Sequence, residues 1–134
     1  MDIINSTNYV EKAETVIKEL IEEAKKNEKY PDNYKILSTS QLRKQLSMTA
    51  ELFALAGQES SDTLSLDLLD RIEYLRVQLV YQAGRDKLVK KFIDKAGILQ
   101  ILKSVNGNRE DFLIFCRYME ALVAFRKFHG KEDK

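Results

Sequence analysis

The sequence predicts an all-α protein, a compact five-helix bundle that forms a single domain. Apolar residues recur at helical spacing along nearly the whole chain, and no segment alternates strictly for more than a few residues, as a strand would. Proline, the commonest helix breaker, occurs once in 134 residues. A chain of this length can build one hydrophobic core but not two comfortable ones. The predicted helices cover about 9–29, 39–56, 64–83, 85–104 and 109–129.

The first predicted helix, 9–29, carries one apolar stripe, and Glu and Lys fill its other faces. The stripe comprises Val10, Ala13, Ile17, Leu20, Ile21 and Ala24. Asn8 and Glu11 have the spacing of a capping pair at its start. The segment 30–35 contains the single proline and is expected to be a linker.

The second predicted helix, 39–56, has the clearest start in the chain. Ser38 and Gln41 fit a capping box, and Leu37 with Leu42 fits the hydrophobic staple around it. We expect its buried stripe to comprise Leu42, Leu46, Ala50 and Phe53. Gly57 and the polar residues after it end the helix.

The third and fourth predicted helices are joined by a very short connection. Gly84 can adopt the left-handed conformation that closes the helix 64–83. In 85–104 the apolar residues occupy one half of the helical wheel and the lysines the other. The apolar residues after Gly97 would fall on the basic half, which predicts a kink or restart there. The fifth helix, 109–129, follows the turn 106–108, with Asn108 as its N-cap.

Composition argues against most kinds of catalytic or metal site. The chain has one His and one Cys, too few for a zinc site, and a Ser-His or Cys-His pair would have to use His129 near the C-terminus. The five glycines are scattered and form no phosphate-binding loop. Cys116 is expected to be a buried structural thiol. We therefore predict a protein without catalytic residues, metal or cofactor.

The sequence indicates a cytoplasmic protein that does not associate with membranes. No apolar run approaches the roughly 20 residues that cross a bilayer, and the N-terminus does not resemble a secretory signal. A single cysteine cannot form an internal disulfide.

Charge is unevenly distributed although the net charge is only +1. Residues 59–73 contain five acidic residues against one arginine, and residues 85–103 contain six basic residues against two aspartates. Bases open the second helix (Arg43, Lys44) and the fourth (Arg85, Lys87). Backbone amides at helix starts attract phosphate, and bases there add charge. The charges alone leave phosphate binding and simple solubility about equally supported. Likewise, Tyr74, Tyr81 and Tyr118 fit either base stacking or, more often for a helical tyrosine, the core margin.

Three stretches resemble the small helical subunit of type III-A CRISPR effector (Csm) complexes. They are STSQLRK at 38–44, LRVQLVYQAGR at 75–85 and DFLIFCRYMEALVAFRK at 111–127. The resemblance covers about 37–128 and rests on the order of the three motifs, since none is specific by itself. The chain departs from the commoner pattern with Leu42, where a β-branched residue is usual, and with Phe125-Arg126.

The resemblance implies a non-catalytic subunit that stacks with further copies of itself in a short filament. Its partners would be the guide RNA, the target RNA and the backbone and large subunits of the Csm complex, which hold the nuclease activities. The matching basic positions are Arg43, Lys44, Arg85, Arg126 and Lys127. The helical wheel adds Lys87 and Lys91, and the central motif adds Arg76. Because the guide sequence changes, such contacts should go to phosphates and sugars.

Two other functions stay open on the sequence alone. The chain could be a helical protein–protein interaction module with no direct nucleic-acid role, its bases being incidental. A small helical enzyme would require paired carboxylates or a metal in a cleft.

Overall fold

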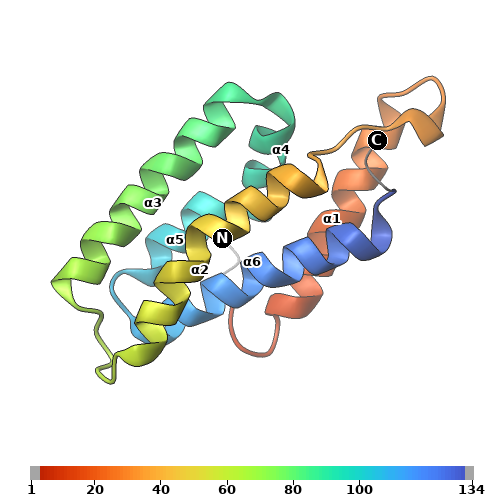
Figure 1. Ribbon diagram of the computed structural model, residues 1–134. Helices are drawn as coiled ribbons and strands as arrows, with labels where there is room; N and C mark the ends of the chain where they lie inside the picture. The colour runs from red at the N-terminus through yellow and green to blue at the C-terminus, as the bar shows by residue number, and fades with distance from the viewer. Residues whose placement is uncertain (1–3, 132–134) are drawn as a thin grey trace.

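The all-α prediction is confirmed by the computed structural model, which describes residues 4–131 and is built from helices (Figure 1). The elements in chain order are α1 (Tyr9–Lys26), the short 3-10 helix η1 (Pro31–Asn33), α2 (Thr39–Gln58), α3 (Leu66–Arg85), α4 (Lys87–Ala96), α5 (Ile98–Val105) and α6 (Arg109–His129). Within the described residues there are thus six α-helices and not the predicted five.

The additional helix arises because the predicted helix 85–104 is divided at Gly97. Gly97 has φ +66°, a left-handed conformation that a side chain would strain, and its N–H bonds back to the end of α4. The restart turns Ile98, Ile101 and Leu102 into the core, where each is buried. The predicted break at Gly97 is confirmed, and burial of these three residues is its physical reason.

Two predicted helix ends were wrong. Gly84 lies inside α3, and the break falls at Asp86, whose extended backbone (φ −146°) separates α3 from α4. Asn8 does not cap α1; its side-chain oxygen accepts a hydrogen bond from the Asn5 N–H instead. The capping box of α2 and the Asn108 cap of α6 are confirmed.

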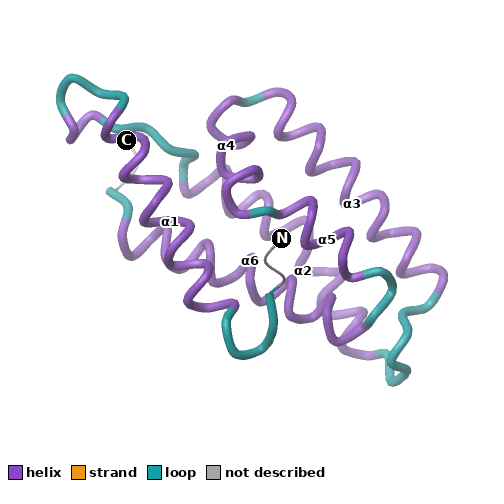
Figure 2. Tube along the Cα trace, turned by 180° about the vertical axis from the view of Figure 1, so that it is seen from behind, coloured by secondary structure: helices purple, strands orange, loops and turns teal. Residues whose placement is uncertain are grey.

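Helix α6 is the centre of the core. Phe112, Phe115, Tyr118 and Met119 have no exposed surface, and α6 packs most extensively against α1 and α2. Helix α3 packs against α2, α4 and α5 and lies on the side of the molecule opposite α1 (Figures 1 and 2). The buried residues of these helices form one continuous cluster.

The three tyrosines considered for base stacking in the sequence analysis have different environments in the structure. The Tyr118 hydroxyl donates a hydrogen bond to the carbonyl oxygen of Ala96 at 2.8 Å, and burial raises its pKa. Tyr118 is therefore a core residue. Tyr74 and Tyr81 are exposed on α3.

The buried face of α2 differs from the predicted stripe. Ala50 is exposed, and Leu46 and Phe53 are only half-buried. The buried residues are Leu42, Gln45, Thr49, Leu52 and Ala56. Hydrophobic periodicity missed this face because two of its five members are polar. On α1, the predicted Val10 is likewise exposed.

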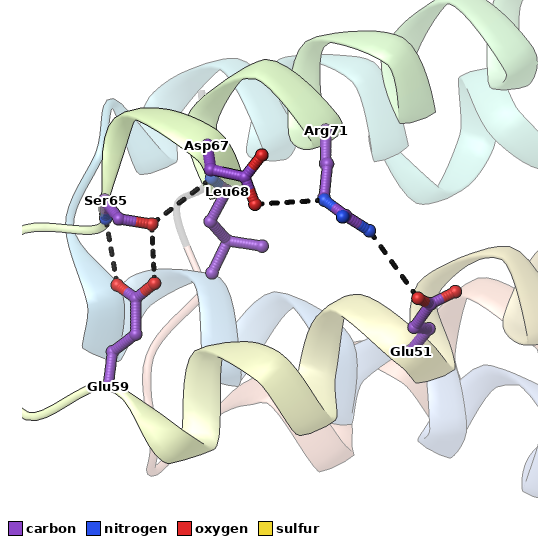
Figure 3. A network of polar contacts seen from close by, with 6 residues as sticks. All are labelled: Glu51, Glu59, Ser65, Asp67, Leu68 and Arg71. Carbon is purple, nitrogen blue, oxygen red and sulfur yellow. Dashed lines mark hydrogen bonds and ion pairs between the residues drawn. The ribbon is translucent and has the colours of Figure 1, made fainter.

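A polar network joins α2 to the start of α3 (Figure 3). The Glu59 carboxylate accepts hydrogen bonds from the backbone N–H and the hydroxyl of Ser65, which lower its pKa. Arg71 pairs with Asp67 at 3.2 Å and with Glu51 at 3.6 Å. Glu59 from the acidic segment and Glu51 on α2 therefore join α2 to α3.

Arg126 is buried in the protein, so it is not available as one of the predicted RNA-binding residues. Its side chain is 3% exposed. Nε donates to the carbonyl oxygen of Leu37 at 3.0 Å, and Nη1 donates to that of Lys131 at 3.1 Å. The backbone N–H of Lys131 in turn donates to the Tyr34 hydroxyl. These contacts hold the loop between α1 and α2 beside the end of α6 (Figure 2).

We predict that Arg126→Ala lowers the free energy of unfolding by about 2–4 kcal/mol, because main-chain oxygens lose charged donors inside the protein. Urea denaturation measures the change. Lys127→Ala is the matched control, because Lys127 is the exposed neighbour; it should change stability by less than about 0.5 kcal/mol. Equal losses in the two variants would contradict the role given to Arg126.

Candidate nucleic-acid interface

Three adjoining hollows lie where α2 and α4 begin. The first, of about 590 Å³, lies between α1, the loop before α2, and α4. The second, of about 750 Å³, shares Lys35, Ile36 and Leu88 with the first. The third, of about 140 Å³, shares Gln41 with the second and reaches the end of α3. We call this continuous surface the basic groove. One end of the groove, the first hollow, carries the cations Lys26, Lys35 and Lys91. The other end, the third hollow, carries Lys44 and Arg85.

The fold brings together two predicted residues that are distant in sequence. Lys44 comes from the second turn of α2, and Arg85 is the last residue of α3, yet both line the third hollow. The Arg85 guanidinium also lies over the Tyr81 ring, 5.7 Å from its centroid. Lys44 and Arg85 therefore form one local site for negative charge.

The first hollow holds one predicted cation and two that the sequence analysis missed. Lys91 was predicted from the helical wheel of α4, whereas Lys26 ends α1 and Lys35 lies in the loop. Helical spacing could not find the missed pair, because only the path of the loop brings them beside Lys91. The floor of this hollow is apolar and comprises Leu20, Ala24, Ile36 and Leu88.

Lys95 also borders the first hollow, but its charge is used within the protein. Its ammonium lies 3.2 Å from Glu19 and 2.8 Å from Glu23. The hydrogen bond that the Lys95 ammonium donates to Glu23 is the main cause of the raised pKa of Lys95. Lys95 therefore joins α4 to α1.

The five groove cations differ from Lys95 in having no ion pair with a carboxylate among residues 4–131. Arg85 and Lys91 were predicted from the start and the helical wheel of the fourth predicted helix. Lys44 was predicted from the start of the second helix, and Lys26 and Lys35 were not predicted. An exposed cation without a carboxylate partner keeps its attraction for phosphate, subject to screening by salt. The five cations share the groove with the carboxylates of Glu23, Glu28, Asp32, Asp86 and Asp94, so the attraction for an anion is local to the cations.

The remaining predicted residues lie elsewhere. Arg76 pairs with Glu73 at 3.3 Å and lines a separate hollow between α3 and α5. Arg43, Lys87 and Lys127 are exposed but line none of the three hollows of the groove. They can extend the electrostatic field of the groove without forming its walls.

A chain of hydrogen bonds fixes α2 relative to α4 at the centre of the groove. The Gln41 side chain accepts from the Ser38 N–H at 2.8 Å and donates to Asp86 Oδ2 at 2.8 Å. Asp86 Oδ1 accepts from the N–H groups of Leu88 and Val89 at 2.9 and 3.1 Å. The hydrogen bond from Val89 is the main cause of the lowered pKa of Asp86.

This arrangement corrects the expected way of binding phosphate. Phosphate was expected to use free amides at the starts of the second and fourth helices. In the structure Ser38 caps α2 and Asp86 caps α4, so these amides already have acceptors. The amides of Gln41, Leu88 and Val89 are therefore not free for a phosphate.

Two further titratable groups, Cys116 and His129, line none of the three hollows of the groove. Burial raises the pKa of the Cys116 thiol to about 12, which keeps it protonated at neutral pH. His129 lies 2.6 Å from Glu14 and joins α6 to α1. Residues 4–131 contain no group of three metal-ligating side chains. No helix in this part of the chain has the length and apolar character that a bilayer crossing requires.

Comparisons with known proteins agree with the motifs. A family model described as Csm2 Type III-A matches residues 14–132. A protein of Streptococcus thermophilus named CRISPR system Cms protein Csm2 is 46% identical over 133 residues, which cover 99% of this chain and 100% of that protein. Proteins of the same name from Mycobacterium tuberculosis (strain CDC 1551 / Oshkosh) and Enterococcus italicus are 46% and 35% identical, covering 73% and 72% of this chain and 79% and 71% of their own lengths.

The Asp86 junction predicts a specific dependence of stability on pH. Because its folded pKa lies below the ordinary value of 3.8, the Asp86 carboxylate stabilises the fold fully above that pH. The contribution is lost as the pH falls through the folded pKa. We expect the wild type to lose more stability below about pH 4 than Asp86→Asn, which keeps a capping oxygen but no titrating charge.

Urea denaturation of both proteins at pH 7, 4 and 3 measures this difference. Asp70→Asn, which removes an exposed carboxylate from α3, is the control and should follow the wild type. Parallel pH profiles for the wild type and Asp86→Asn would refute the assignment.

Proposed function

This chain belongs to the Csm2 Type III-A family, and from that premise we propose that it is a small, non-catalytic subunit of a type III-A CRISPR complex. In this proposal it binds the backbone of the guide and target RNA through the basic groove. Its other partners are further copies of itself and the backbone and large subunits of the complex.

The observation that carries the RNA-binding proposal is the meeting of Lys44 and Arg85 in one hollow. They come from different helices, and neither has a carboxylate ion partner among residues 4–131. A second group of cations lies farther along the groove, in the first hollow. Two cationic ends joined by a continuous surface suit the repeated charge of a sugar–phosphate chain.

The groove supports backbone binding rather than recognition of sequence. Its cations are flexible side chains suited to phosphate oxygens, and phosphate contacts carry no sequence information. One subunit would neutralise only a few phosphates, so binding by the isolated chain should be weak and sensitive to salt. Repeated copies along one RNA would raise the affinity through effective concentration.

A role in protein–protein contacts is favoured by a different surface. Helix α3, which lies on the outer side of the molecule (Figure 1), exposes a set of large apolar side chains, which are Leu66, Tyr74, Val77, Val80 and Tyr81. Exposed apolar side chains that gather on one element are typical of interaction surfaces. Because α3 contributes only its last residues to the groove, contacts with other subunits and with RNA can occur together.

The triple variant Lys44→Gln, Arg85→Gln, Lys91→Gln tests the RNA-binding proposal. At about 0.1 M salt each lost phosphate contact should weaken binding of single-stranded RNA about fivefold, or about hundredfold for three. The slope of log K against log salt should become shallower by about 2. Fluorescence anisotropy of the full chain with a labelled RNA, titrated with KCl, measures both quantities.

The control is Arg71→Gln, Arg76→Gln, Lys90→Gln, which removes the same charge from cations that pair with carboxylates. It should weaken binding far less. If the two triple variants bind RNA equally well, the groove is not the RNA-binding surface and the interaction module becomes the better interpretation.

A further inference from the structure

The buried face of α2 contains a side chain whose hydrogen bonding is incomplete. Gln45 is 1% exposed, and its Oε1 is enclosed without a hydrogen-bond partner among the described residues. Leaving such an acceptor unpaired costs about 1–3 kcal/mol, and folded proteins do so rarely. Thr49, one turn further along α2, is equally buried, but its hydroxyl donates to the carbonyl oxygen of Leu46 at 2.7 Å. Gln45 is therefore the exception on this face.

Gln45 lines the third hollow of the basic groove together with Lys44, Gln82 and Arg85. The hollow has a volume of about 140 Å³. A water molecule occupies about 30 Å³ of liquid, so a group of the size of a phosphate fits. The side chain of Gln45 thus lines the same small space as the two cations, although its Oε1 is itself enclosed and reaches that space only when the amide rotates.

The only carboxylate of this hollow is already satisfied. Asp86 accepts hydrogen bonds from the N–H groups of Leu88 and Val89 and from the Gln41 amide. The groups left for a ligand are the ammonium of Lys44, the guanidinium of Arg85 and the amides of Gln45 and Gln82. A matching ligand must carry negative charge and, beside it, a hydrogen-bond donor.

A ribonucleotide backbone has this combination and a deoxyribonucleotide backbone does not. Phosphate oxygens accept hydrogen bonds but donate none at neutral pH. The donor of the sugar–phosphate chain is the ribose 2′-hydroxyl, which DNA lacks. A half-turn of the Gln45 amide exchanges Oε1 and Nε2, so the oxygen can be presented to the hollow.

We propose that the third hollow is a ribose–phosphate subsite in which Gln45 Oε1 accepts a hydrogen bond from a 2′-hydroxyl while Lys44 and Arg85 bind the adjacent phosphate. The proposal rests on the RNA-binding function proposed above. It adds a chemical basis on which one position of the groove selects RNA over DNA without reading the base.

Gln45→Leu tests the subsite, because it removes the acceptor and nearly keeps the shape. The probes are three single-stranded oligonucleotides of one sequence, made of RNA, 2′-fluoro RNA and DNA. The 2′-fluoro sugar keeps the ribose pucker but has no donor, so it separates hydrogen bonding from shape. We expect the wild-type full chain to bind RNA about three- to tenfold more tightly than 2′-fluoro RNA. Gln45→Leu should bind these two within about twofold and keep the wild-type salt dependence.

Thr49→Val is the matched control, since it removes a buried polar group from the same face outside this hollow. It should keep the wild-type preference for RNA. Thermal unfolding verifies that each variant folds, and Gln45→Met, which is unbranched like glutamine, replaces Gln45→Leu if the latter is unfolded.

The two proposals fail in different ways. If the wild type shows no salt-dependent binding of RNA, the proposed function itself is overturned. If the wild type binds RNA with a salt dependence that the triple charge variant reduces, but Gln45→Leu keeps the wild-type ratio of RNA to 2′-fluoro RNA, only the subsite is overturned. An unchanged ratio with loss of a protein partner from the complex would show that the hollow receives a protein side chain instead.

Discussion

Burial of the segment 112–116 of α6 on all its sides is the constraint on which the rest of this structure depends. Five consecutive residues, 112–116, are buried, so no face of that part of the helix can meet solvent. A helix that is apolar all round must be surrounded by other elements. Helices α1 and α2 supply the largest contacts and α5 adds a third. The restart at Gly97 serves the same requirement, because a continuous helix 85–104 would turn Ile98 and Ile101 toward solvent.

The basic groove follows from this packing. Once α1 and α2 lie against α6, the loop between them must pass the end of α6, where Arg126 bonds to its main chain. The Gln41–Asp86 hydrogen bond then joins the start of α2 to the start of α4. Both helix starts are capped by side chains, Ser38 on α2 and Asp86 on α4. Structural contacts and the charge of the groove are therefore parts of one arrangement.

The net charge of the chain is near zero, but its acidic and basic side chains have different roles in the structure. Acidic residues near the α2–α3 connection bond to Ser65 and Arg71 and stabilise the fold (Figure 3). Among residues 4–131, Lys26, Lys35, Lys44, Arg85 and Lys91 of the groove have no ion pair with a carboxylate, whereas Lys95 pairs with Glu19 and Glu23. Helix α3 exposes five large apolar side chains beside exposed charged residues such as Glu73 and Arg76. In the proposed function RNA binding and assembly use different surfaces, because the groove lies at the starts of α2 and α4 and most of these apolar side chains lie along α3.

By itself the sequence determined the helical class, the caps at Ser38 and Asn108, the break at Gly97 and the family motifs, because each depends on neighbours within about one helical turn. Only the tertiary structure decided which cations share a surface. It buried Arg126, paired Arg76 with Glu73 and brought Lys26 and Lys35 beside Lys91. It also buried polar Gln45, which apolar periodicity could not indicate. These outcomes depend on how helices pack across the core, and spacing along one helix does not specify that.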